Sequence, residues 1–359
     1  MKKTDKLILI SVVLLSLFGL LMIYSSSSIW AEYKFNDSYK FLKTQGIFLV
    51  IGYFIIYIIS KIPYQTYLKY SNIILISCIV LLILVLIPGI GSIRNGSRSW
   101  FGIGSLGIQP SEFAKIGIII FAAKYLTNNK MKDITHSVLP ILCVVILVFG
   151  LIMLQPDFGT GIIIVVTIIV LLFISGVKMS FFIKLGVIGL IGIIGLIIIA
   201  PYRLKRIVSF INPWADSLGS GFQIIQSLYA IGPSGLLGTG LGNSIQKHFY
   251  LPEPQTDFIF SIISEELGFM GVLIVTTLFI IIIYRGIETS IKQEDNFAKY
   301  LSFGLIFSLA FQTILNLMVV VGLIPVTGVT LPFLSYGGSS LLVSMTNIGI
   351  ILNISKHRK

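Results

Sequence analysis

Charged side chains are scarce in this sequence. Only 11% of its 359 residues are Asp, Glu, Lys or Arg, whereas soluble domains carry about 25%. This shortage excludes a soluble enzyme of this size, because too few charges remain to cover its surface. Cysteine and histidine are also rare: Cys78 and Cys143 lie within apolar stretches, and the three histidines stand singly. Neither a disulfide framework nor a histidine-based metal site is indicated.

Hydrophobic residues make up 55% of the chain and form long blocks such as Leu7–Tyr24, Ile73–Ile87 and Ile162–Ile174. A helix that crosses a bilayer needs about 20 apolar residues, and these blocks do not alternate as the strands of a membrane β-barrel do. We therefore predict an all-α polytopic membrane protein, with a single integral membrane domain over residues 1–359. Ten transmembrane helices are expected, at residues 7–27, 43–60, 71–88, 110–126, 137–154, 158–175, 182–200, 258–284, 299–322 and 338–354.

The net charge of +12 is explained by topology rather than by a nucleic-acid partner, because basic residues gather in cytoplasmic loops. With the N-terminus in the cytoplasm, 16 basic residues fall inside and nine outside, which predicts that both termini are cytoplasmic. Three outer segments are then rich in Gly, Pro and Ser: Gly89–Gln109, a large loop at about 201–257, and Leu323–Gly338. Irregular backbone near a bilayer must be buried or line a wet cavity, so we expect the chemistry on the outer face.

Asp257 belongs to the strongest candidate site, Leu251–Phe260. Thr256 or Asp257 is placed to cap the eighth span, and this structural role is one interpretation of the aspartate. The functional interpretation starts from the neighbouring acids Glu253, Glu265 and Glu266, because a charge within a membrane helix is costly. Such a cluster predicts either divalent-cation binding, with Asp257 and Glu253 as ligands, or a general base.

A second candidate pair, Glu112 and Lys115, lies in the motif Gln109–Lys115. At a spacing of three residues the two side chains share one helix face. Opposite charges within a span are less costly together than apart. They form either a structural ion pair between helices or the floor of a polar cavity beneath the outer loops.

Basic residues in the outer loops form a third candidate group: Arg94, Arg98, Arg203, Lys205 and Arg206. Arginine pairs bidentately with phosphate oxygens, so a lipid with a diphosphate headgroup is a suitable ligand. The structural alternative is anchoring at the membrane interface by side chains that extend toward water.

Three further segments carry weaker patterns. The glycines of Gly238–Gly242 predict a flexible loop, since no strand precedes them and no helix signature follows. Gln155–Thr160 predicts a short turn in which Asp157 caps the sixth span. Pro325–Ser340 predicts a re-entrant segment whose glycines allow close backbone approach.

Six stretches in order resemble the SEDS family of bacterial cell-wall proteins, which includes FtsW, RodA and SpoVE, with greater similarity to the FtsW and SpoVE branch. They read NGSRSWF, QPSEFAK, LQPDFGT, NPWADSLGSGFQIIQSLYAIGP, LPEPQTDFIFSIISEELG and GLIPVTGVTLPFLSYGGSS. The resemblance implies a ten-helix peptidoglycan glycosyltransferase that polymerises lipid II into β-1,4 glycan strands. It implies that Asp257 is the essential aspartate, and it adds Gln223 and Ser339 to the candidate lipid II-binding residues.

The resemblance also implies a location in the bacterial cytoplasmic membrane among its lipids, a Mg or Mn ion, and a partner. That partner is a class B penicillin-binding protein, whose transpeptidase crosslinks the new strands. Two other functions stay open: a flippase for lipid II, and a non-catalytic scaffold that activates the transpeptidase. A role in cell division, cell shape or sporulation is expected.

Overall fold

The fold is predominantly helical, in agreement with the predicted class. The structure, a computed structural model, describes residues 4–94, 96–102, 107–128, 138–199, 208, 210–219 and 221–358. Within those ranges ten helices have at least 15 residues: α1 (Lys6–Phe35), α2 (Lys40–Ile59), α3 (Tyr64–Leu84), α4 (Pro110–Asn128), α6 (Leu139–Met153), α7 (Phe158–Ile174), α8 (Met179–Ile199), α11 (Ile259–Ile291), α12 (Asn296–Val320) and α13 (Gly338–Ser355). Shorter elements are the hairpin of β1 (Ser92–Arg94) and β2 (Ser97–Trp100), the 3-10 helix η1 (Pro213–Asp216) and the helix α10 (Phe222–Ile231).

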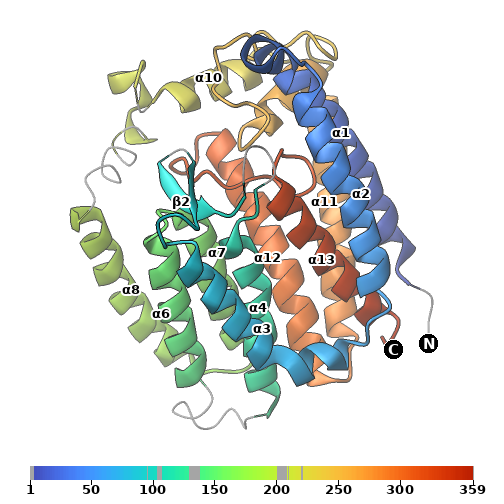
Figure 1. Cartoon of the computed structure of the whole chain (residues 1–359), viewed down its shortest axis with the longest axis vertical. Coiled ribbons are helices and arrows are strands. Elements are labelled where there is room, and N and C mark those ends of the chain that lie inside the picture. Colours follow the sequence, from blue (N-terminus) through green and yellow to red (C-terminus); the bar gives the residue numbers. More distant parts are fainter. Residues whose placement is uncertain are drawn as a thin grey trace.

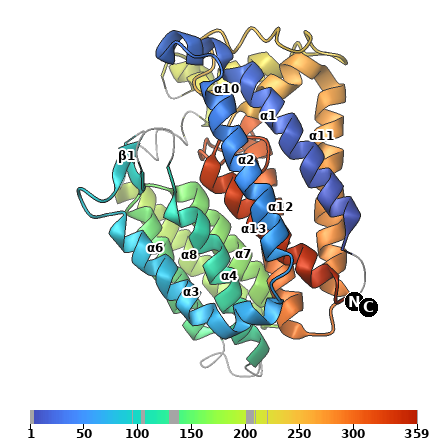
Figure 2. The same ribbon diagram turned by 45° about the vertical axis from the view of Figure 1, so that its right-hand side comes forward.

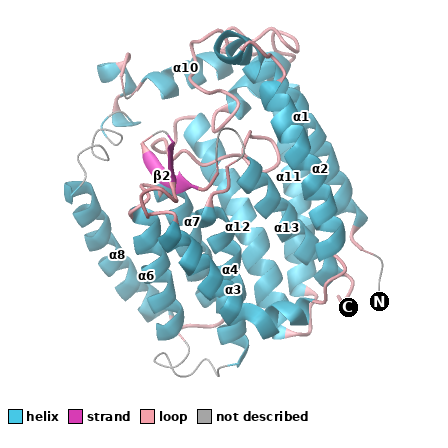
Figure 3. Ribbon diagram, in the orientation of Figure 1, coloured by secondary structure: helices cyan, strands magenta, loops and turns pink. Residues whose placement is uncertain are grey.

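The long helices form one bundle with two distinct ends (Figures 1 and 2). Both chain ends lie together at one end, called here the terminal end. The β-hairpin, α10 and most of the irregular segments lie at the other, the loop end (Figure 3). Helix α12 packs against α4, α7, α11 and α13 and so joins the two sides of the bundle.

Burial in the bundle fits a hydrocarbon solvent. Large apolar side chains such as Val50, Phe54 and Ile73 are exposed, while polar ones such as Gln312 and Asn316 are buried. In the part of the chain that the structure describes, six helices are long and apolar enough to cross a membrane, namely α1, α2, α3, α11, α12 and α13. The ten long helices match the ten predicted spans in order.

The end of the first span differs from the prediction for an identifiable reason. Helix α1 continues to Phe35 rather than ending near residue 27. The hydroxyls of Ser26 and Ser27 donate hydrogen bonds to the Ile23 carbonyl one turn earlier in the helix. The Ser25 hydroxyl donates to the buried carboxylate of Glu266 in α11. These polar residues extend the helix because their hydrogen bonds are satisfied inside the bundle, which counting apolar residues does not detect.

Helix α11 is broken near the loop end. Gly268 has φ 61° and ψ −157°, a conformation outside the helical region that glycine adopts at low cost. A short piece, residues 259–267, therefore precedes the long membrane-crossing part. Asp257 stands immediately before this short piece, so the position of the piece determines the position of the aspartate.

At the terminal end, Asp5 joins three parts of the chain. Its buried carboxylate accepts hydrogen bonds from Arg285 of α11 (2.6 Å to Nη2) and Arg358 near the C-terminus (2.8 Å). The same carboxylate caps α1 through the Leu7 N–H. Burial raises the pKa of Asp5, but the hydrogen bonds from the two arginines and from the backbone together lower it by more. The net shift is therefore downward from the ordinary value of 3.8.

We predict that Asp5→Asn destabilises the bundle by about 1.5–3 kcal/mol, the usual value of hydrogen bonds to a charged group. Because the folded-state pKa is depressed, this stabilisation is fully present above pH 3.8 and is lost as the pH falls through the lowered value. Thermal melting of the detergent-solubilised protein between pH 3 and 7 measures both effects. Asp37→Asn is the control, because that exposed carboxylate pairs only at the surface with Lys43. A wild-type acid loss that persists unchanged in Asp5→Asn would contradict the assignment.

Candidate active site

Asp257 lies at the loop end, half-buried, on an irregular segment that is called here the 251–257 loop. Its backbone carbonyl accepts a hydrogen bond from Asn316 Nδ2 of α12 (2.7 Å), and its Oδ1 accepts one from Thr256 Oγ1 (2.9 Å). The N-cap of α11 is Phe258, without a side-chain cap bond. The predicted capping role for Thr256 or Asp257 is therefore wrong, which removes the structural explanation for a half-buried carboxylate at this point.

The 251–257 loop is joined to a second irregular stretch, the 323–337 segment. The Tyr336 N–H donates to the Gln255 carbonyl (2.7 Å), and Asn316 Nδ2 also donates to the Val329 carbonyl (2.7 Å). Helices α1 and α7 approach the segment so closely that a methyl group on Gly19 or Gly159 would overlap it. The segment is thus irregular backbone held between helices, with residues 331–335 buried.

Both irregular stretches contain backbone strain. Glu253 and Phe333 adopt positive φ angles of 44° and 65°, a region that costs a non-glycine residue about 1–3 kcal/mol. Such strain persists only where surrounding contacts impose it. The contacts of both stretches with the helices around them therefore hold this geometry in place.

Beneath these stretches lies the predicted ion pair. Lys115 Nζ is 2.9 Å from Glu112 Oε2, and both side chains are buried. The ammonium also donates to Gln312 Oε1 (2.7 Å), whose Nε2 donates to the Thr330 carbonyl (3.0 Å). The pair is therefore a structural link between α4 and α12 and, through Gln312, supports the 323–337 segment from below.

Ser339 and Asp157 hold neighbouring helix ends in place. The buried Ser339 hydroxyl accepts from the Gln109 N–H (2.9 Å) and donates to the Gly107 carbonyl (3.2 Å). Asp157 caps α7 as predicted and also accepts from Ser111 (2.8 Å) and from the Gln109 amide (2.9 Å). Ser339, a candidate lipid II-binding residue, thus has its hydroxyl engaged inside the protein.

The two arginines of the hairpin do not gather. Ile93 pairs with Arg98 and Arg94 with Ser97 across the strands, and side chains of successive pairs point to opposite faces. Arg94 lies on the same face of the hairpin as Ser97, whose hydroxyl donates to the Gln155 carbonyl in the bundle. This face is therefore the one directed toward the bundle. Arg98 takes the other face.

Arg94 is the arginine directed toward the site. Its guanidinium lies over the Trp100 ring (5.0 Å) and against Gly107, and its buried Nη2 has no hydrogen-bond partner among the described residues. Burial raises the pKa of the Tyr336 phenol, while a hydrogen bond with Thr44 and the Arg94 charge act in the opposite sense. The arginine is therefore close enough to the 323–337 segment to act on it electrostatically. Arg203, Lys205 and Arg206 lie outside the described residues.

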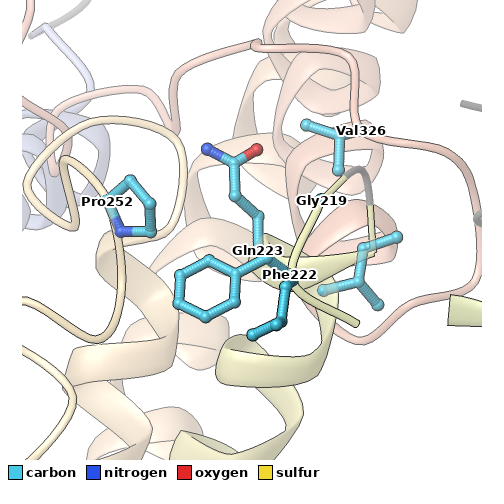
Figure 4. Close-up of a pocket in the computed structure, with 7 residues that line it drawn as sticks. Gly219, Phe222, Gln223, Pro252 and Val326 are labelled. Atoms are coloured by element: carbon cyan, nitrogen blue, oxygen red, sulfur yellow. The ribbon is translucent and has the colours of Figure 1, made fainter. Parts of the chain in front are cut away.

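Gln223 lines a cavity of about 360 Å³ on the loop end (Figure 4). Helix α10 supplies the glutamine, the 251–257 loop supplies Pro252 and the 323–337 segment supplies Val326. Three segments that are distant in sequence therefore meet at one opening. Two of them are the stretches that Asn316 joins around Asp257.

Glu265 and Glu266 do not take part in a carboxylate cluster with Asp257. Glu266 accepts from Ser25 of α1 (2.7 Å) and from Lys247 (3.0 Å), all three buried or nearly so. Glu265 accepts from the Ser244 hydroxyl and from the backbone N–H groups that follow it. The two glutamates thus bind residues 244–247 of the large loop to the short piece of α11. This contact is called here the loop clamp.

The loop before the clamp is docked rather than free, which corrects the prediction for Gly238–Gly242. The N–H groups of Thr239 and Gly240 donate to the Glu265 and Glu266 carbonyls (2.9 Å each). In return, Phe269 N–H donates to the Gly235 carbonyl (2.9 Å). The loop therefore satisfies the backbone groups that the break at Gly268 leaves without helical partners.

Several residues of the site escaped the motif analysis, namely Ser25, Lys247, Gln312 and Asn316. Gln312 and Asn316 carry a usable signal, because two amides one helical turn apart within a span are costly unless they bond inside the bundle. Ser25 and Lys247 carry none, since their partners are distant in sequence. Within the described ranges, no three His, Cys, Asp or Glu side chains gather as a metal-binding group.

The fold and the site together define a polytopic helical membrane protein. A half-buried aspartate lies at its loop end, bonded to buried polar side chains of the bundle. A family model described as "Cell cycle protein", covering FtsW, RodA and SpoVE, matches residues 5–359. The chain belongs to this FtsW/RodA/SpoVE family.

Relatives agree in sequence and in structure. Stage V sporulation protein E of Bacillus subtilis is 51% identical, with 100% of this chain and 99% of that protein covered. A protein of Geobacter sulfurreducens named probable peptidoglycan glycosyltransferase FtsW is 39% identical, with 100% and 96% covered. A solved chain described under "Structural coordination of polymerization and crosslinking by a peptidoglycan synthase complex" superposes with a TM-score of 0.80 at 27% identity, covering 98% of this chain and 97% of that one. The crystal structure of Thermus thermophilus RodA gives 0.73 at 26%, covering 99% and 97%.

The loop clamp leads to a stability prediction. Lys247→Met leaves Glu266 buried without its cation, a change that costs about 3–5 kcal/mol. Hydrogen exchange of residues 234–250 is expected to accelerate in this variant. The double variant Lys247→Met/Glu266→Gln is expected to recover much of the protection, because it no longer has an unpaired buried carboxylate. Lys61→Met, at an exposed lysine of the terminal end, is the matched control. Equal exchange in Lys247→Met and wild type would show that the ion pair does not hold the loop.

Proposed function

We propose that this protein polymerises lipid II into β-1,4 glycan strands at the outer face of the bacterial cytoplasmic membrane. The loop end faces outward and both termini face the cytoplasm. The observation that carries the proposal is the placement of Asp257: a half-buried carboxylate, outside any helix cap, fixed by Asn316 on the loop that supplies Pro252 to the wall of a cavity at the loop end. Family membership and relatives named as peptidoglycan glycosyltransferases support it.

Asp257 is the general base of the reaction. The acceptor's 4-hydroxyl oxygen forms a bond to C1 of the donor sugar while the bond from C1 to the diphosphate oxygen breaks. A carboxylate is a weak base, so Asp257 accepts the hydroxyl proton as the new bond forms and not before. The Thr256 hydroxyl, which donates to Oδ1, orients the carboxylate.

The departing undecaprenyl diphosphate takes the electron pair and needs positive charge. Among the described basic candidates, Arg94 is best placed. It lies on the bundle side of the hairpin near Tyr336, with one buried nitrogen available for a phosphate oxygen. Glu112 and Lys115 act indirectly, by holding the 323–337 segment through Gln312.

A divalent cation, Mg²⁺ or Mn²⁺, suits the donors present. The turn of Glu253 and Thr256 brings the Glu253 carbonyl to the Thr256 hydroxyl (2.7 Å), so two carboxylates stand on one tight loop. The buried oxygens Gln255 Oε1 and Asn316 Oδ1 have no hydrogen-bond partner among the described residues. Mg²⁺ prefers oxygen ligands and commonly binds through one or two carboxylates and water. Asp257 and Glu253 would hold the ion, which would neutralise charge on the diphosphate.

The proposed partner is a class B penicillin-binding protein that crosslinks the product. The structural neighbour whose description joins polymerisation and crosslinking in one complex supports this partner. A polymerase that releases its product outside the cell needs a crosslinking enzyme on the same side, which agrees with the outward loop end.

The first test is polymerisation of labelled lipid II by purified protein with its partner. Asp257→Ala and Asp257→Asn are expected to lower the rate at least about 100-fold, the lower limit of general-base contributions. Asp37→Ala, an exposed acid of the same end, is expected to keep full activity. Partner binding, measured by co-purification, is expected to stay intact in all three.

Each competing function gives a different result. Equal polymer from wild type and both Asp257 variants would remove Asp257 from the mechanism. Movement of labelled lipid II across vesicles without polymer would support a flippase. Unchanged activation of the transpeptidase without polymer from any variant would support a scaffold.

A second prediction separates the two arginines of the hairpin. Arg94→Ala is expected to lower kcat by about 100-fold, similar to the loss of one donor that stabilises developing negative charge. Arg98→Ala, on the opposite face, is expected to change kcat less than threefold. Rates at saturating lipid II measure this difference. Equal losses in the two variants would mean that the hairpin matters as a fold and not through Arg94.

A further inference from the structure

The cavity that Gln223 lines at the loop end is mainly apolar. Its volume is about 360 Å³ and its walls are Leu218, Gly219, Phe222, Gln223, Ile224, Pro252 and Val326. Among these side chains only Gln223 carries a hydrogen-bonding group, and none is charged. In Figure 4 the amide of Gln223 extends between Pro252 and Val326. The cavity is therefore apolar with a single amide.

Helix α10 holds Gln223 in this orientation. Ile224 and Ile225 of the helix are buried. The buried Ser227 hydroxyl donates to the Val320 carbonyl of α12 (2.6 Å) and lies 2.7 Å from the Ser261 hydroxyl of α11. These contacts fix the rotation of α10 about its axis, so the glutamine is placed by the fold rather than by chance exposure.

The lining side chains that the structure describes carry no charge, which determines what they can bind. A diphosphate or a peptide carboxylate would be desolvated there without a counter-charge, which is strongly unfavourable. A neutral group with one amide and a small apolar part fits this lining, because its amide can bond to Gln223 and its apolar part can contact the apolar walls. An acetamido substituent has this composition, since its N–H and C=O pair with the two ends of a glutamine amide and its methyl group lies against apolar walls.

We propose that this cavity is a sugar subsite that recognises the acetamido group of an N-acetylhexosamine through Gln223. The inference rests on the proposed function and deepens it, because it assigns the sugar of lipid II to a specific part of the loop end. Phe222 and Val326 provide the apolar surface for the methyl group and the sugar ring. The volume is at the low end of the range for ligand sites, about 300–1,000 Å³, which suits one sugar rather than a long isoprenoid chain.

The test is equilibrium binding of lipid II, labelled on its peptide, to the protein in nanodiscs. Two ligands are compared, one with N-acetylated sugars and one with N-deacetylated sugars. Wild type is expected to prefer the acetylated ligand about tenfold more than Gln223→Ala does, a ratio typical of a lost neutral hydrogen-bonded pair. Because both proteins meet the same two ligands, any general effect of the free amine cancels when their preferences are compared.

The matched control is Gln226→Ala, on the same helix but outside the cavity lining. It is expected to keep the wild-type preference. Undecaprenyl diphosphate, which has no sugar, is expected to bind wild type and Gln223→Ala equally. A Gln223→Ala variant that keeps the preference would overturn the proposal, and weaker binding of undecaprenyl diphosphate would show that the cavity holds the lipid instead.

Failure of the subsite and failure of the proposed function are distinguishable. Binding requires no polymerisation, so Asp257→Asn is expected to retain the acetyl preference while making no polymer. If wild type makes no polymer but shows the preference, the polymerase proposal fails and the sugar site stands. If Gln223→Ala does not fold, the milder Gln223→Met tests the same loss, because it keeps side-chain length and removes the amide.

Discussion

The side-chain amide of Asn316 is the interaction on which the loop end depends. Its nitrogen donates to two backbone carbonyls, those of Asp257 and Val329, at 2.7 Å each. These carbonyls belong to two irregular stretches that have no ladder or helix of their own to satisfy them. In a bundle surrounded by hydrocarbon, each unpaired peptide group costs several kcal/mol. One amide on a rigid helix therefore satisfies both stretches and fixes the aspartate relative to α12.

The break in α11 follows from the same constraint. A helix that stops inside a bundle leaves N–H and C=O groups without partners, and here residues 235–240 supply them. The glycines on both sides are required by contact as well as conformation, because a methyl group on Gly238 or Gly268 would overlap the opposing backbone. The large loop is consequently packed against the short piece of α11 that follows Asp257.

Ten spans, their order and the Gly/Pro-rich irregular segments between them were predictable from the sequence, because long apolar blocks and Gly/Pro-rich stretches are local features. The Glu112–Lys115 pair was also predictable, since a charge within a span is costly enough to require a role, whereas Asp257 was singled out by its position between the large loop and the eighth span. The partners of these residues were not. Gln312 completes the ion pair from 197 positions away, and Ser25 reaches Glu266 across 241, distances at which no local pattern carries information.

The two buried ion pairs explain how a strained site stays rigid. In each pair the lysine has a second acceptor, Gln312 Oε1 for Lys115 and the Gly242 carbonyl for Lys247. A buried pair adds little net stability over an apolar pair of the same shape, but removal of one partner is strongly unfavourable. Such pairs therefore act mainly by penalising displacement. One lies below the 323–337 segment and the other beside the short piece of α11, so the two stretches around Asp257 are held against movement from both sides.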